Sequence, residues 1–414
     1  FPSVALGWVP TGYKFIQETF PWLDYLKIRA SYGSVGNDRI TDVRFPYLTK
    51  VNEGTGSTWG VTNIEIINET RIGADNLAWE KAIKSNLGIE GKLFNNKLDF
   101  VVDIFHDQRN GIFQQRVQVP EYVGVVSNPY ANVGKMKSYG ADGNISFTQD
   151  ITPDFGFTLR GNFTYSKNKV QNWEQAYLEY PYLEYNNFPY NSIRGYQAIG
   201  LFKDEDDIKY SPKQTFGEVM PGDIKYKDIS GPDGVPDGKI SSEYDRVCLG
   251  GSLPRYTFGV NFAASYKGFD LAMMFQGVGS QNVRINSNMI EGLRNNWCGF
   301  PSILEGNYWS VNNTDAENAK AIYPRLTRNN IDSNMAMSDF WMFNGRYLRM
   351  KNLTLGYTLP SVLTKKISME SVRFYVSGND LFCLSKYPHG WDPEVSTTGY
   401  PITTSVLLGV SVNF

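Results

Sequence analysis

Ser405-Val-Leu-Leu-Gly-Val-Ser-Val-Asn-Phe414 is the stretch that decides the fold. Its apolar residues fall at every second position, and smaller or more polar residues stand between most of them. Successive side chains of a β-strand point to opposite faces, so this spacing gives one apolar face. A strand wall between lipid and a water-filled interior needs this alternation. The stretch therefore predicts a membrane-crossing strand, with Val406, Leu408, Val410, Val412 and Phe414 on the apolar face.

The same two-residue alternation recurs upstream and differs from the 3.6-residue period of a helix. Leu26 and Ile28 alternate with Lys27 and Arg29, so an apolar face is backed by a charged one. A face that carries two cations needs water, as the lumen side of a barrel wall would provide. The pattern returns in residues 98–104, 157–165, 257–262, 269–275 and 372–377.

The composition excludes several other classes of protein. The 414 residues contain no apolar run of the roughly 18 residues that a membrane-spanning helix needs, so neither such a helix nor a signal peptide is expected. Tyr, Phe and Trp make up 14% of the chain, which suits strands and interfacial aromatic girdles. A formal net charge of -2 argues against nucleic acid as a partner. Cys248, Cys298 and Cys383 lack metal-site spacing, although one disulfide pair remains open.

Short and long connections alternate between the expected strands, as they do in outer-membrane barrels. Counting strands in pairs around the short turns gives about eleven. Single-chain bacterial barrels have even strand numbers, and an open sheet would leave unpaired edges in hydrocarbon, so the chain is expected to be half of a 22-stranded barrel. With the C-terminus in the periplasm, every long segment lies outside the cell. The expected turns are 94–97, 150–154, 267–268 and 360–371, and the long segments are 37–78, 109–131, 169–254, 280–345 and 383–402.

Short phrases spread in order over the whole chain carry a family resemblance. They include Phe1-Pro-Ser-Val-Ala-Leu-Gly-Trp8, Leu26-Lys-Ile-Arg-Ala-Ser-Tyr-Gly33, Pro221-Gly-Asp-Ile-Lys-Tyr226, Tyr347-Leu-Arg-Met-Lys-Asn-Leu-Thr-Leu-Gly-Tyr-Thr-Leu-Pro360 and Asp392-Pro-Glu394. Together they resemble the C-terminal half of SusC/RagA-type TonB-dependent transporters, outer-membrane importers of Bacteroidetes. Each phrase is short, and it is their order and spread that make the resemblance specific.

The resemblance implies an all-β fold in which residues 1–414 form the C-terminal half of a transmembrane barrel, with the plug and TonB box upstream of residue 1. It implies a protein of the bacterial outer membrane that imports a bulky nutrient, an oligosaccharide or a peptide. The implied partners are a SusD-like surface lipoprotein, the TonB-ExbB-ExbD complex acting through the N-terminal half, and outer-membrane lipids. No covalent chemistry is implied, and no cofactor for catalysis.

Aromatic residues crowd one outer segment and are candidates for ligand contact, because aromatic faces stack on sugar rings or anchor a protein lid. Packing of loop on loop is the alternative. A second aromatic group in the next long segment, Trp297, Phe300, Tyr308 and Trp309, suits lid contact or internal packing. Charges on the inner wall are candidates for solute contact, with pairing to the plug as the alternative. The ligand candidates are Trp173, Tyr177, Tyr180, Tyr182, Tyr185, Arg29, Asp99 and Arg160, with Asp103 as a further wall charge.

One acidic segment, residues 228–245, resembles a calcium loop found at this place in the family. Carboxylate oxygens on a loop bent by glycine suit Ca²⁺. Pro232 interrupts the pattern, and the spacing to the last acid exceeds that of a standard loop. A solvated acidic turn is the alternative to a structural calcium site. The candidate ligands are Asp228, Ser230, Asp233, Asp237 and Asp245.

Enzyme functions find no support in the sequence. The two histidines, His106 and His389, belong to different segments, so neither a Ser-His-Asp triad nor a histidine-based zinc site has visible parts. Two other functions stay open. One is a siderophore or cobalamin receptor of the TonB-dependent type, and the other is a secreted, soluble β-rich glycan-binding protein.

Overall fold

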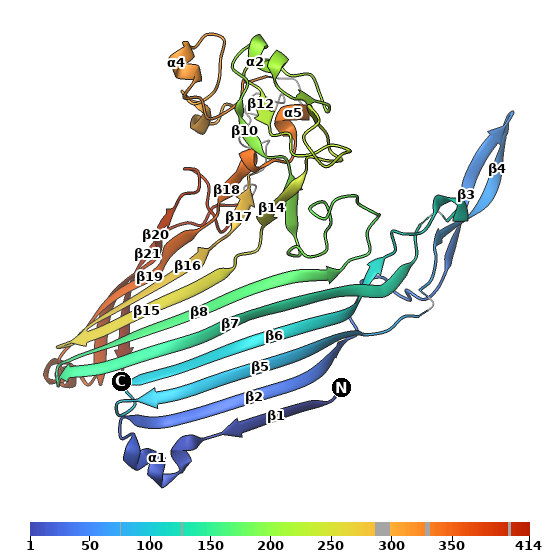
Figure 1. The fold of residues 1–414 in the computed structure, drawn as a ribbon. Coiled ribbons are helices and arrows are strands. Elements are labelled where there is room, and N and C mark those ends of the chain that lie inside the picture. The colour runs from blue at the N-terminus through green and yellow to red at the C-terminus, as the bar shows by residue number, and fades with distance from the viewer. Residues whose placement is uncertain (75, 126, 286–298, 328–331, 396–398) are drawn as a thin grey trace. The chain divides into compact units, whose positions relative to one another are not determined.

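A computed structural model describes the chain except for residues 75, 126, 286–298, 328–331 and 396–398. Its dominant element is an antiparallel sheet of 11 strands, and sheet neighbours follow one another along the chain (Figure 1). The expected number of membrane strands is therefore confirmed. The strands, in sheet order, are β1 (Ser3–Trp8), β2 (Leu23–Asn37), β5 (Glu80–Leu93), β6 (Leu98–Gln115), β7 (Tyr130–Thr152), β8 (Phe155–Asn172), β15 (Tyr256–Tyr266), β16 (Phe269–Gly279), β19 (Tyr347–Thr358), β20 (Ser371–Ser385) and β21 (Ser405–Asn413).

Four of the five short connections lie where the sequence predicts turns. Lys267 and Gly268 join β15 to β16 with φ angles of 47° and 89°, the left-handed pair that a two-residue hairpin turn requires. Asn95 and Asn96 take left-handed angles between β5 and β6, a conformation that asparagine tolerates better than most residues. β7 and β8 are joined through Pro153 and Asp154. The other two connections contain η1 (Pro10–Gly12) with α1 (Lys14–Thr19), and α6 (Ser361–Thr364) with η5 (Lys365–Ile367).

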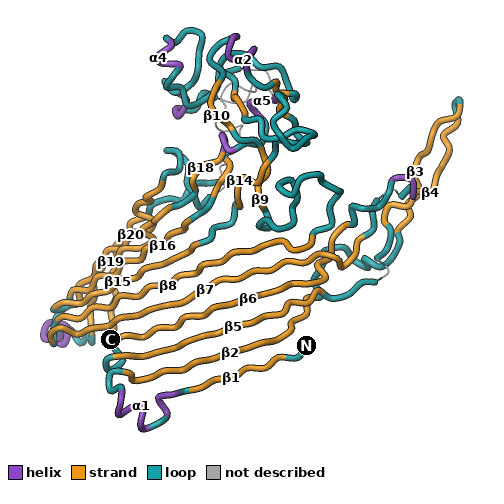
Figure 2. The backbone as a smooth tube through the Cα atoms, in the orientation of Figure 1, coloured by secondary structure: helices purple, strands orange, loops and turns teal. Residues whose placement is uncertain are grey.

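The long connections alternate with the short ones, as expected, and Figure 2 shows that they are mostly loop. No helix in the described part of the chain is long and apolar enough to cross a bilayer. The elements within the long connections are β3 (Lys50–Trp59), β4 (Thr62–Arg71), η2 (Glu121–Val123), β9 (Ser192–Gly195), β10 (Ala198–Leu201), α2 (Glu205–Tyr210), β11 (Lys213–Gln214), β12 (Ile224–Tyr226), β13 (Lys239–Ile240), β14 (Val247–Gly251), β17 (Asn282–Arg284), η3 (Ser302–Leu304), α4 (Asp315–Asn318), α5 (Asp332–Met335), η4 (Asp339–Trp341) and β18 (Met342–Asn344).

The chain divides into two compact units, residues 1–143 with 165–190, and residues 144–164 with 191–414. In the first unit, one face of β2, β5 and β6 is charged. The strand register places Arg29 opposite Gly88, and Gly88 opposite Asp103. The Arg29 guanidinium reaches across that glycine to Asp103, at 2.6 Å from Nη2 to Oδ2. A Cβ at Gly88 would lie 2.6 Å from the Asp103 carboxylate, so only glycine leaves room for this ion pair. The next register position, Ile28 opposite Ile89, belongs to the apolar face.

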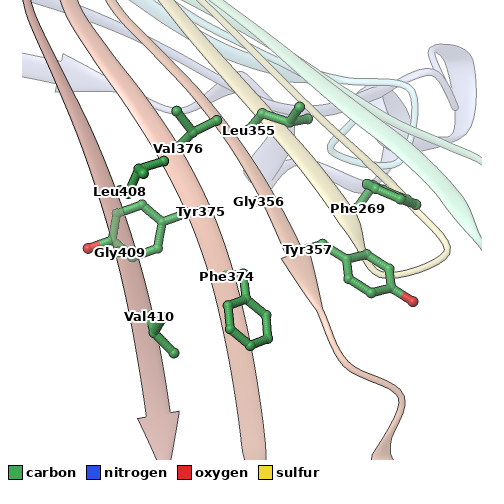
Figure 3. Close-up of a pocket in the computed structure, with 10 residues that line it drawn as sticks. All are labelled: Phe269, Leu355, Gly356, Tyr357, Phe374, Tyr375, Val376, Leu408, Gly409 and Val410. Carbon is green, nitrogen blue, oxygen red and sulfur yellow. The ribbon is translucent and has the colours of Figure 1, made fainter.

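In the second unit, the same two-faced pattern holds for β16, β19, β20 and β21. On the polar face, Arg373 pairs with Asp270 and lies over the Tyr375 ring, with the guanidinium carbon 5.0 Å from the ring centroid. The Tyr375 ring in turn covers Gly409, where a Cβ would meet it at 2.2 Å. The opposite face is apolar, and side chains of all four strands line a shallow groove of about 520 Å³ (Figure 3). These include Phe269, Leu355, Phe374, Val376, Leu408 and Val410.

A buried hydrophobic cluster lies in the long connections of the second unit and not on the sheet. Trp341, Tyr226, Ile224 and Leu304 are almost completely buried there. The apolar side chains of β21 are exposed instead; Leu408 has 85% of its surface accessible. A water-soluble domain would cover such a face with a second layer of structure. Exposure of one whole apolar face therefore fits a wall whose solvent on that side is lipid.

Leu408 and Leu407 offer a direct test of the two faces, because they are the same residue type at neighbouring depths. Leu408 pairs with Val376 on the apolar face, whereas Leu407 pairs with Ser377, whose hydroxyl bonds Asn352 and Thr354 on the polar face. A lysine on the lipid side near mid-membrane costs about 2 to 4 kcal/mol. We expect Leu408→Lys in the full-length protein to lower the amount of folded protein in the outer membrane, measured by heat-modifiable migration, and Leu407→Lys to leave it near wild type. Equal levels of both variants would contradict the assignment of the faces.

Candidate functional site

The aromatic segment that follows β8 folds back on itself in the first unit. Val170 N–H donates to the Phe188 carbonyl, and Trp173 N–H donates to Asn186 Oδ1 at 2.7 Å. Trp173 lies 5.9 Å from Tyr190, ring centroid to ring centroid. The five aromatic ligand candidates therefore sit on one ordered loop, but in different environments. Tyr177 is 88% exposed and Tyr185 is also exposed, whereas Trp173, Tyr180 and Tyr182 are half-buried, the last two stacked on each other at 5.7 Å.

A polar cavity of about 410 Å³ lies beside this segment. Glu174 connects the aromatic segment to residues 116–118 on the other side of the cavity. One oxygen, Oε1, accepts from the backbone N–H groups of Val117 and Gln118, and Oε2 lies 2.5 Å from Arg116 Nε. Tyr177 lines the same cavity and turns most of its surface to solvent. Amide, carboxylate and guanidinium groups next to an exposed ring can bind a polar ligand that has one apolar face.

The predicted wall charges divide into two groups. Arg29 and Asp103 are held by the ion pair of the wall itself, and Arg29 Nε also lies 2.7 Å from Glu90 Oε1. Their charges are therefore largely neutralised without a solute. Asp99 is half-buried on β6, and Arg160 is exposed on β8 with no carboxylate at ion-pair distance among the described residues.

A second charge cluster joins β19 to the connection between β20 and β21. Arg349 has a side chain only 4% exposed, and its Nη2 lies 2.6 Å from both oxygens of Asp392 while its Nε bonds Glu394 Oε1 at 3.0 Å. Lys351 bonds Glu394 at 2.8 Å and Asp380 at 3.0 Å. Both cations of the wall thus bind acids of this loop, and Asp380 of β20 adds a third carboxylate on the wall side. Sequence reasoning missed the cluster, since its members are 29 to 45 positions apart across the two sides.

Buried charges also organise the loop core of the second unit. The Asp223 carboxylate is fully buried and accepts bonds from Arg325 Nε at 2.7 Å, from the Asn334 amide at 2.8 Å and from Met220 N–H at 2.8 Å. The preceding Gly222 has φ 87° and lies so close to Trp309 that a Cβ would meet that ring at 2.4 Å. Trp309 is therefore a packing residue. Phe300 and Tyr308 form an edge contact at 5.9 Å, while Trp297 and Cys298 lie outside the described residues.

The acidic loop uses its carboxylates to hold its own backbone. Asp245 is fully buried, and its two oxygens accept from Ile229 N–H and Ser241 N–H at 2.7 Å each. Asp228 accepts from Gly238 N–H, and Asp237 accepts from Lys239 N–H. Burial raises the pKa of Asp228, the Gly238 hydrogen bond opposes that rise, and the charges of Asp245 and Asp237 add to it.

Over the described ranges, no three acidic, histidine or cysteine side chains are grouped as a metal ion requires. Ser230 is buried with its hydroxyl directed to the Gly231 carbonyl, and Asp233 is exposed. As folded, the loop thus does not assemble the five candidate ligands, and calcium binding there stays a prediction of the sequence. Cys248 and Cys383 are free thiols.

Comparison with known proteins gives a consistent result. The family model "TonB dependent receptor-like, beta-barrel" matches residues 1–381. TonB-dependent receptor P3 of Formosa agariphila is 28% identical over 96% of this chain and 38% of its own length. TonB-dependent receptor SusC of Bacteroides thetaiotaomicron is 25% identical over the whole chain and 40% of its own length. The chain thus spans about two fifths of the length of these curated relatives.

Among solved structures, the RagAB peptide transporter matches with a TM-score of 0.74 at 23% identity, covering all of this chain and 43% of that one. At this identity the match concerns the fold. It agrees with the 11-stranded sheet and with the alternation of short turns and long loops found above.

Asp223 provides a test of the loop core, with the exposed Asp233 of the same connection as its control. Removing one partner of a buried ion pair costs about 3 to 5 kcal/mol because the other charge is left uncompensated. We expect Asp223→Asn to expose the loop core of the detergent-purified, full-length protein to limited proteolysis within 196–226 and 304–341 while the barrel strands stay protected. Asp233→Asn should digest like wild type, and an unchanged pattern for Asp223→Asn would contradict the structural role of the pair.

Proposed function

This chain belongs to the TonB-dependent receptor β-barrel family, and from that premise we propose that the complete protein imports a bulky nutrient through the outer membrane. Relatives that carry TonB-dependent receptor names, SusC among them, match over essentially the whole chain. The protein is an outer-membrane transporter of SusC/RagA type and not an enzyme. The chain supplies wall and loops for that activity.

The observation that supports a bulky, polar ligand is the cavity beside the aromatic segment. It places the exposed Tyr177 ring next to Glu174, Arg116 and Gln118, a mixture suited to a sugar or a peptide segment. RagAB is described as a peptide transporter, and this chain shares its fold. An oligosaccharide is the other substrate class that we propose to test, because ring faces stack on sugars as readily as on side chains.

A SusD-like surface lipoprotein is the partner that we propose for capture of the ligand. The support is the similarity to SusC and to RagAB, together with the folded core that the long connections form in the second unit. Coupling to TonB, ExbB and ExbD is proposed from membership of the family alone. Neither partnership is visible in this chain.

Of the two alternative functions, one is excluded and the other requires a binding experiment. A secreted, soluble glycan-binding protein is wrong, because the family match and the lipid-type apolar face both identify a membrane wall. A siderophore or cobalamin receptor is a member of the same wide family, so substrate binding has to separate it from the nutrient importer.

Tyr177 and Tyr122 are a matched pair for that test, since both are about equally exposed, at 88% and 90%, and only Tyr177 lines the cavity. We expect Tyr177→Ala in the full-length protein to weaken binding of the cognate ligand about tenfold, the loss of roughly 1 to 1.5 kcal/mol from one aromatic contact. Tyr122→Ala should bind as wild type does.

Binding is measured by calorimetry against an array of oligosaccharides and oligopeptides, with a ferric siderophore and cobalamin as comparators. Preference for either comparator would refute nutrient import of the proposed kind. Equal loss in both tyrosine variants would refute the cavity as the binding site.

A further inference from the structure

The two ends of strand β15 mark the two membrane interfaces. Its 11 residues begin with Tyr256 and end with Tyr266, and Phe258, Val260 and Phe262 lie between them on the same face. About 9 to 11 residues suffice for a tilted strand to cross the hydrocarbon, and aromatic residues gather at both interfaces. Tyr266 adjoins the short turn to β16, so it marks the periplasmic interface. Tyr256 therefore marks the outer interface.

A cavity of about 560 Å³ with a mixed polar and apolar lining, here called the rim cavity, lies at the Tyr256 end of this strand. Gly279 pairs with Tyr256, and the chain then turns through Ser280, with φ 56°, into β17. Asn282 of β17 pairs with Asn344 of β18. Its polar border consists of Tyr256, Ser280, Gln281, Asn282, Asn344 and Arg346, and Met342 and Phe343 add apolar surface.

The register assigns the rim cavity to the lipid side of the wall. Gly277 pairs with Phe258 of the apolar face and with Leu348 of β19, and Leu348 pairs with the exposed Leu384 of β20. Arg346 precedes Leu348 by two residues, and it borders the same cavity as Tyr256 of the apolar face. The polar face at this level belongs instead to Arg349 and its carboxylates. The rim cavity is thus separate from the lumen.

The charge around the rim cavity is positive. Arg346 is exposed, and Asn344 Oδ1 orients it by accepting from its Nε and its backbone N–H at 3.1 Å each. No carboxylate lies at ion-pair distance from Arg346 among the residues that the structure describes. The segments 255–256, 279–284 and 342–346 contain Arg255, Arg284 and Arg346 but neither Asp nor Glu.

Gln281, Asn282 and Asn344 contribute amide groups to the cavity. The Gln281 and Asn282 amides use their nitrogens to bond the carbonyls of Ser252 and Leu249, which fixes both side chains at the cavity wall. The Asn344 amide nitrogen has no partner in the described part of the chain. An oriented guanidinium beside an amide donor matches the oxygens of a phosphate group, which arginine binds with two parallel hydrogen bonds.

We propose that the rim cavity binds the phosphorylated sugar headgroup of an outer-leaflet glycolipid, whose acyl chains lie on the apolar face below. Tyr256 marks the level of the headgroup, and Arg346 and Asn344 bind the phosphate. Phe258, Leu348 and Leu384 contact the hydrocarbon below. A soluble anion would contact only Tyr256, Arg346 and Asn344, and not the apolar face. The site goes beyond nutrient import, because it faces the membrane and not the transport path.

The test uses the full-length transporter in detergent and native mass spectrometry with two probes, bisphosphorylated lipid A and the same lipid without phosphates. Wild type is expected to bind the phosphorylated probe about tenfold more tightly than Arg346→Gln does, the loss of one charged hydrogen-bond pair. Asn344→Asp, which supplies Arg346 with an internal carboxylate, should lose binding as well. Arg39→Gln is the control, since Arg39 is an exposed loop arginine paired with Asp42.

Three results would overturn the proposal. Arg346→Gln could retain the phosphorylated lipid as wild type does, or wild type could bind both probes equally. Inorganic phosphate at millimolar concentration could also displace the phosphorylated lipid completely in wild type, which would make the ligand a soluble anion. Heat-modifiable migration of each variant, expected to equal wild type, verifies that the barrel is folded, so that a lost lipid reflects the site.

Discussion

Backbone hydrogen bonding in hydrocarbon is the constraint on which the rest of this structure depends. Every N–H and C=O group that meets lipid has to be paired inside the protein, and a sheet does so only with its neighbours in register. A slip of one residue would turn Leu408 to the polar face and Leu407 to the lipid. Glycines help to fix the register, because Gly88 and Gly409 leave room for side chains from adjacent strands that a Cβ at these positions would meet. The ion pair of Arg29 with Asp103 therefore depends on the alignment of β2, β5 and β6.

The long connections obey the opposite rule, because their surroundings are aqueous. There the chain builds a conventional core around Trp341 and Tyr226, and it buries the carboxylate of Asp223 only with its cation and amide partners in place. The wall is stabilised by strand pairing with little burial, whereas the loop core is stabilised by burial with little strand pairing. Both solutions occur in one chain because the solvent changes from lipid to water along it.

Much of the wall could be predicted from the sequence, because its signals are local. The alternation of Leu26, Ile28 and their neighbours has a period of two, and turns such as Lys267-Gly268 need left-handed residues at fixed positions. The sites could not be predicted in the same way. Glu174 meets Arg116 and Arg349 meets Asp392 only after strands have aligned segments that are far apart in sequence. For the acidic loop, the sequence could not show that both oxygens of Asp245 accept from backbone N–H groups, and calcium binding there stays a prediction.

The fastening of the last loop to β19 limits how such proteins can be recombined. Arg349 and Lys351 belong to the wall, while Asp392 and Glu394 belong to the loop, so neither half of this charge cluster is complete alone. A loop of residues 386–404 grafted onto a foreign barrel would bring two acids without their cations. A foreign loop grafted here would bury Arg349 without Asp392 and Glu394 and leave it with Asp380 of β20 at 4.0 Å. Exchange of binding specificity between relatives therefore has to move the wall residues Arg349 and Lys351 together with the loop residues Asp392 and Glu394. We expect these four residues to be inherited together.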